Sequence, residues 1–132
     1  MHFPSAEWAS AYRTALNANE GYREAAGAWE GDVLLLVRPT DPAAAAPGIH
    51  LALSHGECQG ATFHEDARTV ESEFVYEGTA ENWRRLLHRE VDPVRALLDG
   101  TFRIRGNLAK AMRYTRAAKE LVETAASIPT DD

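Results

Sequence analysis

Residues 100–113 read GTFRIRGNLAKAMR. The first part of this stretch alternates apolar and basic side chains, which is the pattern of a half-buried β-strand. Phe102 and Ile104 are therefore expected on the buried face of the strand, and Arg103 and Arg105 on its exposed face. A strand with one apolar face needs a covering layer, so the segment indicates a sheet packed against helices.

A turn follows at Gly106-Asn107, where the asparagine side chain can cap the first turn of a helix. Small and apolar residues then recur at helical spacing, which predicts one long helix. Its inward-facing positions are Leu108, Met112, Thr115, Ala118, Val122 and Ala125. Because several of these residues are small, the helix either packs closely on the sheet or leaves unfilled space beneath it.

Two shorter helices are expected just before this stretch. Thr79 can cap the first helix, and Asp92 followed by Pro93 is typical of the start of the second. Each helix carries apolar residues on one side and therefore needs a partner surface. These residues are Trp83, Leu86 and Leu87 in the first helix, and Val94, Leu97 and Leu98 in the second.

Four strands are expected in the middle of the chain. The continuous apolar run 33–37 is typical of a strand that is buried on both faces. Residues 49–55 and 58–65 are predicted to form a hairpin, with Gly56 at the first position of a tight turn. Residues 70–76 form the fourth predicted strand.

Strands and helices are segregated along the chain, which favours an α+β fold. Ser5 can cap a first helix in which Trp8, Tyr12 and Leu16 form one apolar stripe. We expect a five-stranded, mainly antiparallel sheet that is covered on one face by about five helices. The length of 132 residues fits a single domain over residues 1–132.

The composition is that of an ordinary globular protein. Hydrophobic residues make up 45% of the chain and charged residues 26%, and a domain of this size can form a core without disulfides. Cys58 is the single cysteine, so a disulfide within the chain is excluded, which fits a reducing compartment. No apolar run is long enough to span a membrane. These features predict a cytoplasmic protein.

The charge of the chain is distributed unevenly. Residues 1–83 carry 4 basic and 13 acidic side chains, whereas residues 84–119 carry 10 basic and 3 acidic. The basic segment could present a local basic face, or the two regions could neutralise each other in the fold. The net charge of −6 and the lack of a known nucleic-acid-binding motif argue against a nucleic-acid partner.

No sequence signature of catalysis is found. The chain lacks the motifs of serine hydrolases, dinucleotide-binding proteins and P-loop nucleotide hydrolases. His50, His55, Cys58 and His64 are too far apart, or point to opposite faces, to bind one metal ion. His55 is expected opposite Cys58 in the hairpin, which leaves a reactive pair as a minor alternative. We predict no catalytic residues, no metal and no cofactor.

Residues 100–113 resemble a signature of the sterol carrier protein 2 (SCP2) family. In that family a glycine precedes a strand of alternating apolar and basic residues, and a Gly-Asn or Gly-Asp pair opens a long, alanine-rich helix. The sequence DPVRALL at residues 92–98 is also similar to bacterial members, and so is WEGD at residues 29–32 before an apolar strand. The order of the expected elements agrees with the family over nearly the whole chain, so the chain resembles a stand-alone bacterial member.

The resemblance implies a non-catalytic, lipid-binding carrier domain with an apolar tunnel between its helices and its sheet. In this family the tunnel takes fatty acyl chains, acyl-CoA, sterols or other lipids. The residues expected to form its apolar walls are Trp83, Leu86, Leu87, Val94, Leu97, Leu98, Phe102, Ile104, Leu108 and Met112. The alternative is that these side chains fill a close-packed core.

Four basic residues are candidates to hold a carboxylate or phosphate headgroup near the entrance. They are Arg103, Arg105, Lys110 and Arg113. They could equally belong to a solvated sheet edge and helix face. The expected partner is a lipid or fatty acyl ligand, with transient contact with a membrane surface. A different function stays open, in which the same apolar surface forms a homodimer or binds a partner protein without catalysis.

Overall fold

A five-stranded sheet forms the centre of the protein, whose computed structural model describes residues 1–131. The strands lie in the order β3-β2-β1-β4-β5. Neighbouring strands are antiparallel except for β1 and β4, which run parallel. The expected α+β fold with a mainly antiparallel sheet is confirmed, with one parallel pair near its centre. The strands are β1 (Glu30–Arg38), β2 (Gly48–Ser54), β3 (Glu57–His64), β4 (Phe74–Thr79) and β5 (Arg103–Arg105).

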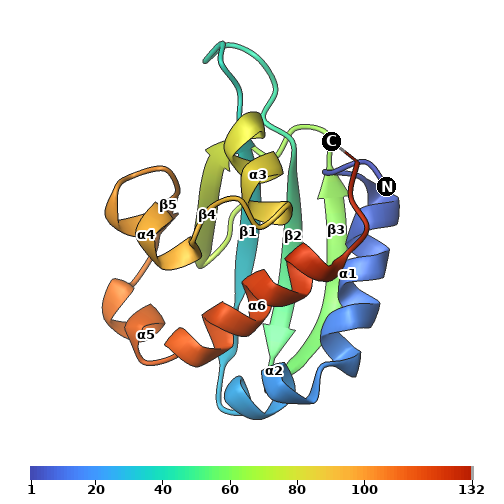
Figure 1. The fold of residues 1–132 in the computed structure, drawn as a ribbon, viewed down its shortest axis with the longest axis vertical. Helices are drawn as coiled ribbons and strands as arrows, with labels where there is room; N and C mark the ends of the chain where they lie inside the picture. The colour runs from blue at the N-terminus through green and yellow to red at the C-terminus, as the bar shows by residue number, and fades with distance from the viewer. Residues whose placement is uncertain (132) are drawn as a thin grey trace.

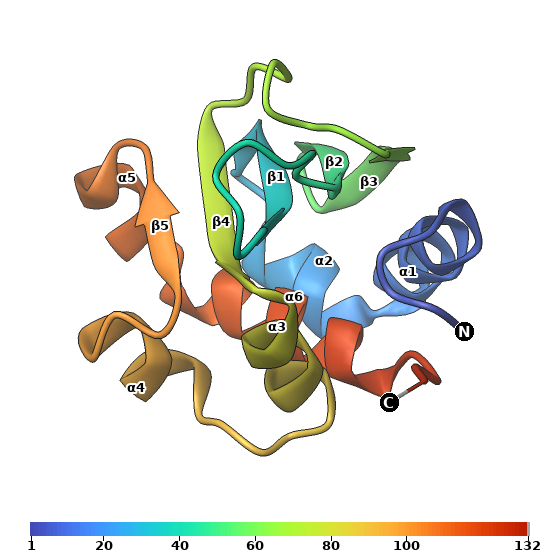
Figure 2. The ribbon, with the colours of Figure 1, turned by 90° about the horizontal axis from the view of Figure 1, so that it is seen from above.

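Helices cover one face of this sheet (Figure 1). Seen from above in Figure 2, the helices lie on one side of the sheet and the loop of residues 65–73 lies on the other. Within residues 1–131 the helices are α1 (Ala6–Ala18), α2 (Glu20–Ala25), α3 (Ala80–Leu87), α4 (Pro93–Leu98), α5 (Leu108–Met112) and α6 (Thr115–Ser127). None of these six has both the length and the apolar character needed to cross a membrane.

Side chains at the helix starts explain where several helices begin. Ser5, Thr79 and Asn107 each accept a hydrogen bond from the main-chain amide three residues later, at the starts of α1, α3 and α5. Asp92 caps α4 by accepting from the amide two residues later, and Pro93 holds the first helical position. These caps satisfy amides that have no partner inside the helix. The four caps expected from the sequence are confirmed.

The hairpin turn and the fourth strand differ from the sequence-based expectation. His55 and Gly56 form the turn between β2 and β3, with φ angles of 49° and 82°, so glycine holds the second turn position and not the first. β4 begins at Phe74, four residues later than expected. The chain before it crosses the outer face of the sheet, where the amide of Glu73 donates to the carboxylate of Asp32 at 2.8 Å.

The predicted long C-terminal helix is interrupted. α5 ends at Met112 and α6 begins at Thr115, and Tyr114 between them has non-helical angles (φ −123°, ψ 35°). The Tyr114 hydroxyl donates to the carbonyl of Ala28 at 3.2 Å. Its ring packs edge-on against Trp29, with 5.0 Å between the ring centroids. These contacts with the segment before β1 redirect the chain, and helical spacing alone carries no sign of them.

Most of the buried apolar side chains lie between the sheet and the helices. Trp8, Tyr12 and Leu16 of α1 are buried there, as their spacing predicts. A smaller apolar cluster, which includes Leu34 and Leu36 of β1, lies on the opposite face under the loop of residues 65–73. β1 is therefore buried on both of its faces, which confirms the interpretation of its continuous apolar run.

Candidate functional site

An apolar cavity of about 210 Å³ lies between the sheet and the helices. The sheet forms its floor, because alternate residues of each strand point to the helical side. The floor residues are Val33 and Leu35 of β1, Leu51 of β2, Phe74 and Tyr76 of β4, and Ile104 of β5. Since these residues come from four neighbouring strands, the cavity lies over the middle of the sheet.

Small side chains of the C-terminal helices keep the space open. Ala111 of α5 lines the cavity, and so do Thr115, Ala117, Ala118 and Ala125 of α6. A cavity persists where side chains are too short to meet the opposite wall. The sequence left open whether these helices pack closely on the sheet or leave unfilled space beneath them. The structure shows unfilled space.

The structure places the ten predicted wall residues in three different environments. Those that line the cavity are Trp83, Leu86, Val94, Leu97 and Ile104. Two others, Leu87 and Phe102, are buried in the packed core. The remaining residues, Leu98, Leu108 and Met112, are exposed on α4 and α5. Contact between any of these side chains and a ligand stays a prediction.

Polar groups of the side chains around the cavity are mostly engaged with the main chain. The Tyr12 hydroxyl donates to the carbonyl of Leu121 at 2.8 Å, and Nε1 of Trp83 donates to the carbonyl of Leu36 at 2.9 Å. The hydroxyl of Tyr76, by contrast, is buried without a hydrogen-bond partner in residues 1–131. Burial raises the pKa of both tyrosines well above its usual value, so both stay neutral. The cavity therefore presents an apolar, uncharged lining.

The cavity opens to solvent beside α4. Val94 and Leu97 of α4 line the cavity and are also exposed, and the same holds for Thr115 and Ala118 of α6. Figure 1 shows α4 and α6 on the same side of the sheet. The opening is therefore bordered by these two helices, and we call it the mouth.

Two of the predicted headgroup residues face away from the cavity. Ile104 lines the cavity, so its neighbours Arg103 and Arg105 on β5 point to the opposite face of the sheet. Nε of Arg105 lies 3.3 Å from the carboxylate of Glu77 on that face. The strand thus has its apolar side inward and its basic side outward, as the alternation predicts.

The other two predicted headgroup residues belong to α5 and its end. Nζ of Lys110 binds the carboxylate of Glu73 at 2.9 Å and the carbonyl of Glu30 at 2.7 Å. This cation therefore ties α5 to the ends of β1 and β4. Arg113 is exposed directly after α5. The four residues do not form one cluster, and binding of a headgroup to them stays a prediction.

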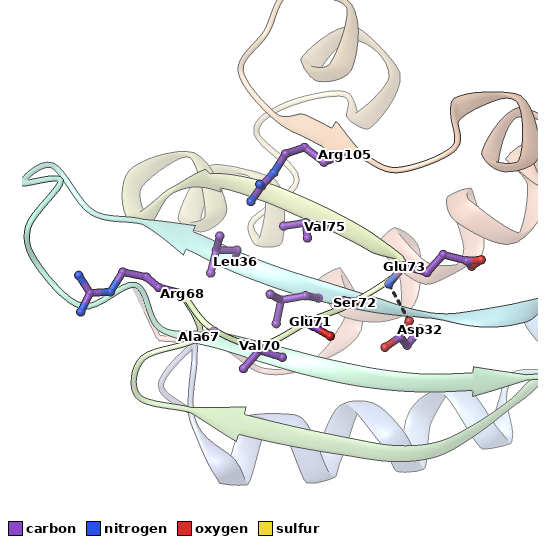
Figure 3. Close-up of a pocket in the computed structure, with 11 residues that line it drawn as sticks. Asp32, Leu36, Ala67, Arg68, Val70, Glu71, Ser72, Glu73, Val75 and Arg105 are labelled. Carbon is purple, nitrogen blue, oxygen red and sulfur yellow. Dashed lines mark hydrogen bonds between the residues drawn. The ribbon is translucent and has the colours of Figure 1, made fainter.

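A second pocket lies on the outer face of the sheet, between the strands and the loop of residues 65–73 (Figure 3). It is larger, at about 840 Å³, but it is an open groove. Leu36 and Val75 form part of an apolar floor, whereas Asp32, Arg68 and Arg105 bring charges of both signs to its border. An apolar ligand would stay in contact with water there, so the cavity between sheet and helices, which is less open, is the better candidate site.

The structure does not support the reactive pair of His55 and Cys58. Leu53 pairs across from Cys58, whereas His55 lies in the turn, with Nδ1 3.2 Å from the carbonyl of Gly27. Cys58 is buried, and burial raises the pKa of its thiol. In residues 1–131, His, Cys, Asp and Glu side chains do not gather in any group of three or more that could hold a metal ion.

Apart from Trp83, the aromatic side chains of the cavity were not predicted from the sequence. Tyr22, Trp29, Phe74, Tyr76 and Tyr114 line it, although none is among the predicted wall residues. Alternation in β4 could have placed Phe74 and Tyr76 on one face. The positions of Trp29 and Tyr114 depend on their mutual contact, which joins segments that are far apart in the chain.

Comparison with solved structures identifies the family. A crystal structure of sterol carrier protein 2 matches the chain with a TM-score of 0.86 and 37% sequence identity, over 95% of this chain and 98% of the other. The chain belongs to the sterol carrier protein 2 family. A solution structure from Thermus thermophilus, of a conserved hypothetical protein with a suggested sterol carrier role, is also similar to this SCP2 family member. It shares 35% identity at a TM-score of 0.85, over 99% of this chain and 92% of its own.

More distant SCP2 structures share the fold. The apo form of SCP2 from Yarrowia lipolytica matches with a TM-score of 0.59 at 13% identity, over 96% of this chain and 94% of its own. No protein-family model matches the chain, and no curated protein matches it. The resemblance inferred from residues 100–113 is thus confirmed by two SCP2-like structures of more than 30% identity.

Proposed function

We propose that this SCP2 family member is a non-catalytic lipid carrier that holds an apolar ligand in the cavity between sheet and helices. The observation that carries the proposal is an uncharged cavity that is lined by aromatic and aliphatic side chains and opens at the mouth. Transfer of each methylene group from water into such a site contributes about 0.8 kcal/mol before ordering costs. Membranes are the natural source and acceptor of such a ligand.

The size of the cavity favours a single acyl chain or a ligand of similar width. Pockets for whole drug-sized molecules enclose about 300–1,000 Å³, whereas this cavity encloses about 210 Å³. A wider ligand needs one wall to move. α4 is the wall best suited to move, because it has six residues and only Ala96 is buried.

Native mass spectrometry of the freshly purified protein tests the proposal directly. We expect a retained lipid, or else uptake of a fluorescent fatty acid that an unlabelled fatty acid displaces. Ala117→Phe should weaken this binding about tenfold or more, because its ring takes the room of at least two methylene groups. Ala18→Phe, on an exposed position of α1, is the matched control and should bind normally.

Ala111→Phe provides a second variant at a half-buried wall position, in case Ala117→Phe does not fold. Circular dichroism establishes folding for each variant. The proposal is wrong if the wild-type protein neither retains a lipid nor binds the fluorescent fatty acid. It is also wrong if folded variants that fill the cavity bind as tightly as the wild type.

A further inference from the structure

Five large hydrophobic side chains are exposed in residues 1–131, and all of them lie in α4 or α5. Their exposed fractions are 66% for Val94, 41% for Leu97, 84% for Leu98, 54% for Leu108 and 69% for Met112. Single exposed apolar residues are common on protein surfaces. It is unusual for every exposed large apolar residue of the described chain to lie on two consecutive helices. We call these five residues the mouth patch.

The mouth patch borders the opening of the cavity on α4 and extends along the same edge of the sheet to α5. Val94, Leu97 and Leu98 lie on one side of α4 by their spacing, and Val94 and Leu97 also line the cavity. Leu108 and Met112 share one side of α5 in the same manner. Figures 1 and 2 show α4 and α5 flanking β5 at the same edge of the sheet. On α4 the exposed apolar surface and the cavity lining are therefore continuous.

The surroundings of the mouth patch are basic. Residues 93–119 carry seven basic side chains and one acidic side chain, Asp99, which is engaged with Thr101. Of the seven, Arg103 and Arg105 point to the outer face of the sheet, and Lys110 binds Glu73. Arg95, Arg113 and Arg116 are exposed, and each is adjacent in the chain to a residue that lines the cavity. The rest of the chain is strongly acidic. Positive charge is thus concentrated where the apolar residues are exposed.

We propose that the mouth patch docks on the surface of an anionic lipid membrane, with the mouth facing the lipid. This inference rests on the proposed function, since it assigns the surface through which the ligand is exchanged. Apolar side chains on one face of a short helix can enter the headgroup region, and basic side chains beside them are attracted to anionic lipids. The charge pattern selects a negatively charged bilayer over a neutral one.

Co-sedimentation with lipid vesicles tests the docking surface. The wild-type protein should bind vesicles of phosphatidylcholine with about one third phosphatidylglycerol, and bind pure phosphatidylcholine vesicles far more weakly. The bound fraction should fall as sodium chloride is added, because salt screens the charges. Leu98→Ser/Met112→Ser should weaken binding to the anionic vesicles about tenfold or more. Neither side chain lines the cavity.

Matched variants separate local from overall charge. Arg95→Gln/Arg116→Gln should weaken vesicle binding about tenfold. Arg38→Gln/Arg68→Gln changes the net charge by the same amount, at the end of β1 and on the outer face, and should leave vesicle binding within about twofold of the wild type. Binding of a fluorescent fatty acid without vesicles is measured in parallel and should be the same for the wild type and for both arginine pairs.

The outcomes distinguish the two proposals. If the wild-type protein binds the fatty acid but ignores anionic vesicles, the docking surface is wrong and the carrier function stands. Equal loss of vesicle binding in both arginine pairs also overturns the docking surface, because the overall charge of the protein would then explain the binding. A concentration-dependent dimer in sedimentation that Leu98→Ser/Met112→Ser abolishes would make the patch a subunit interface instead. Vesicle binding without any fatty acid binding would overturn the carrier function.

Discussion

At the scale of single residues, the Tyr76 hydroxyl stands out because it is buried without a partner among residues 1–131. Its ring is stacked on Phe102 at 5.0 Å and meets Trp83 edge-on at 5.6 Å between centroids. The ring is thus held by packing, while the hydroxyl contributes no hydrogen bond to the described part of the fold. We expect Tyr76→Phe to leave the free energy of unfolding unchanged or to raise it by about 1 kcal/mol.

Tyr12→Phe is the matched comparison for this prediction. The Tyr12 hydroxyl is also buried, but it donates to the carbonyl of Leu121, so its removal should lower the free energy of unfolding by about 1 kcal/mol. Urea denaturation followed by circular dichroism measures both variants. Equal destabilisation by the two substitutions would contradict the prediction.

Asp32 links acid stability to the outer face of the sheet. Burial alone would raise the pKa of its carboxyl group, but the hydrogen bond from the Glu73 amide and the contact with His50 at 2.7 Å outweigh it and lower the pKa below the usual 3.8. A lowered pKa means that the ionised carboxylate stabilises the folded state above the pKa of the unfolded chain. This stabilisation is lost as the pH falls through the lower, folded-state value.

Asp32→Asn should therefore be less stable than the wild type above about pH 5, and the difference should shrink below about pH 4. Urea unfolding of both proteins across this range gives the difference in the free energy of unfolding. A difference that stays constant with pH would show that the charge of Asp32 is not responsible.

At the scale of elements, β4 lies so close to the segment before β5 that only glycine fits at one position. A Cβ atom on Gly78 would lie 2.5 Å from Cε1 of Phe102, which is fully buried. Gly78→Ala should therefore lower the free energy of unfolding by about 1–3 kcal/mol through overpacking.

Gly60→Ala is the control for this effect in another strand. A Cβ atom on Gly60 would meet nothing within 4 Å, so the substitution should be neutral or slightly stabilising. Thermal unfolding of the two variants measures the difference. If Gly78→Ala is as stable as Gly60→Ala, the Phe102 ring can move aside and the close approach does not limit stability.

The elements that could be predicted from the sequence are those specified by local chemistry. The cap residues, the apolar run of β1 and the alternation in β5 depend on neighbouring residues, and each lies where the sequence predicts it. The break at Tyr114 and the late start of β4 depend on contacts with residues far away in the chain. A periodic pattern carries no information about such partners.

The candidate site was predictable to a similar degree. Spacing identifies the apolar sides of α3 and α4, and Trp83 and Leu86 indeed line the cavity. Spacing cannot distinguish a buried apolar side from an exposed one, so it assigns Leu98 and Met112 to the walls although they are exposed. The exposure arises because α4 and α5 are short helices at the edge of the sheet, with no further layer of the described chain outside them.

At the scale of the whole molecule, the two ends of the described chain meet (Figure 1). The amino group of Met1 donates to the carbonyl of Pro129 at 3.1 Å, and the Asp131 amide donates to the carbonyl of Met1 at 2.7 Å. Nε1 of Trp8 in α1 donates to Oγ1 of Thr130 at 2.9 Å. The C-terminal segment therefore fixes α1 against the rest of the helical layer.

Because these two ends lie side by side, a short linker could join them, and the chain could then be opened at another position. The exposed loop between β1 and β2 is the best place, at Ala44-Ala45. A circular permutant opened there, with a short linker to Met1, should keep its circular dichroism spectrum and its fatty acid binding. It should fold more slowly in stopped-flow experiments, because the β1–β2 pairing changes from a local contact to one that spans most of the chain. Unchanged folding kinetics would mean that this pairing forms after the rate-limiting step.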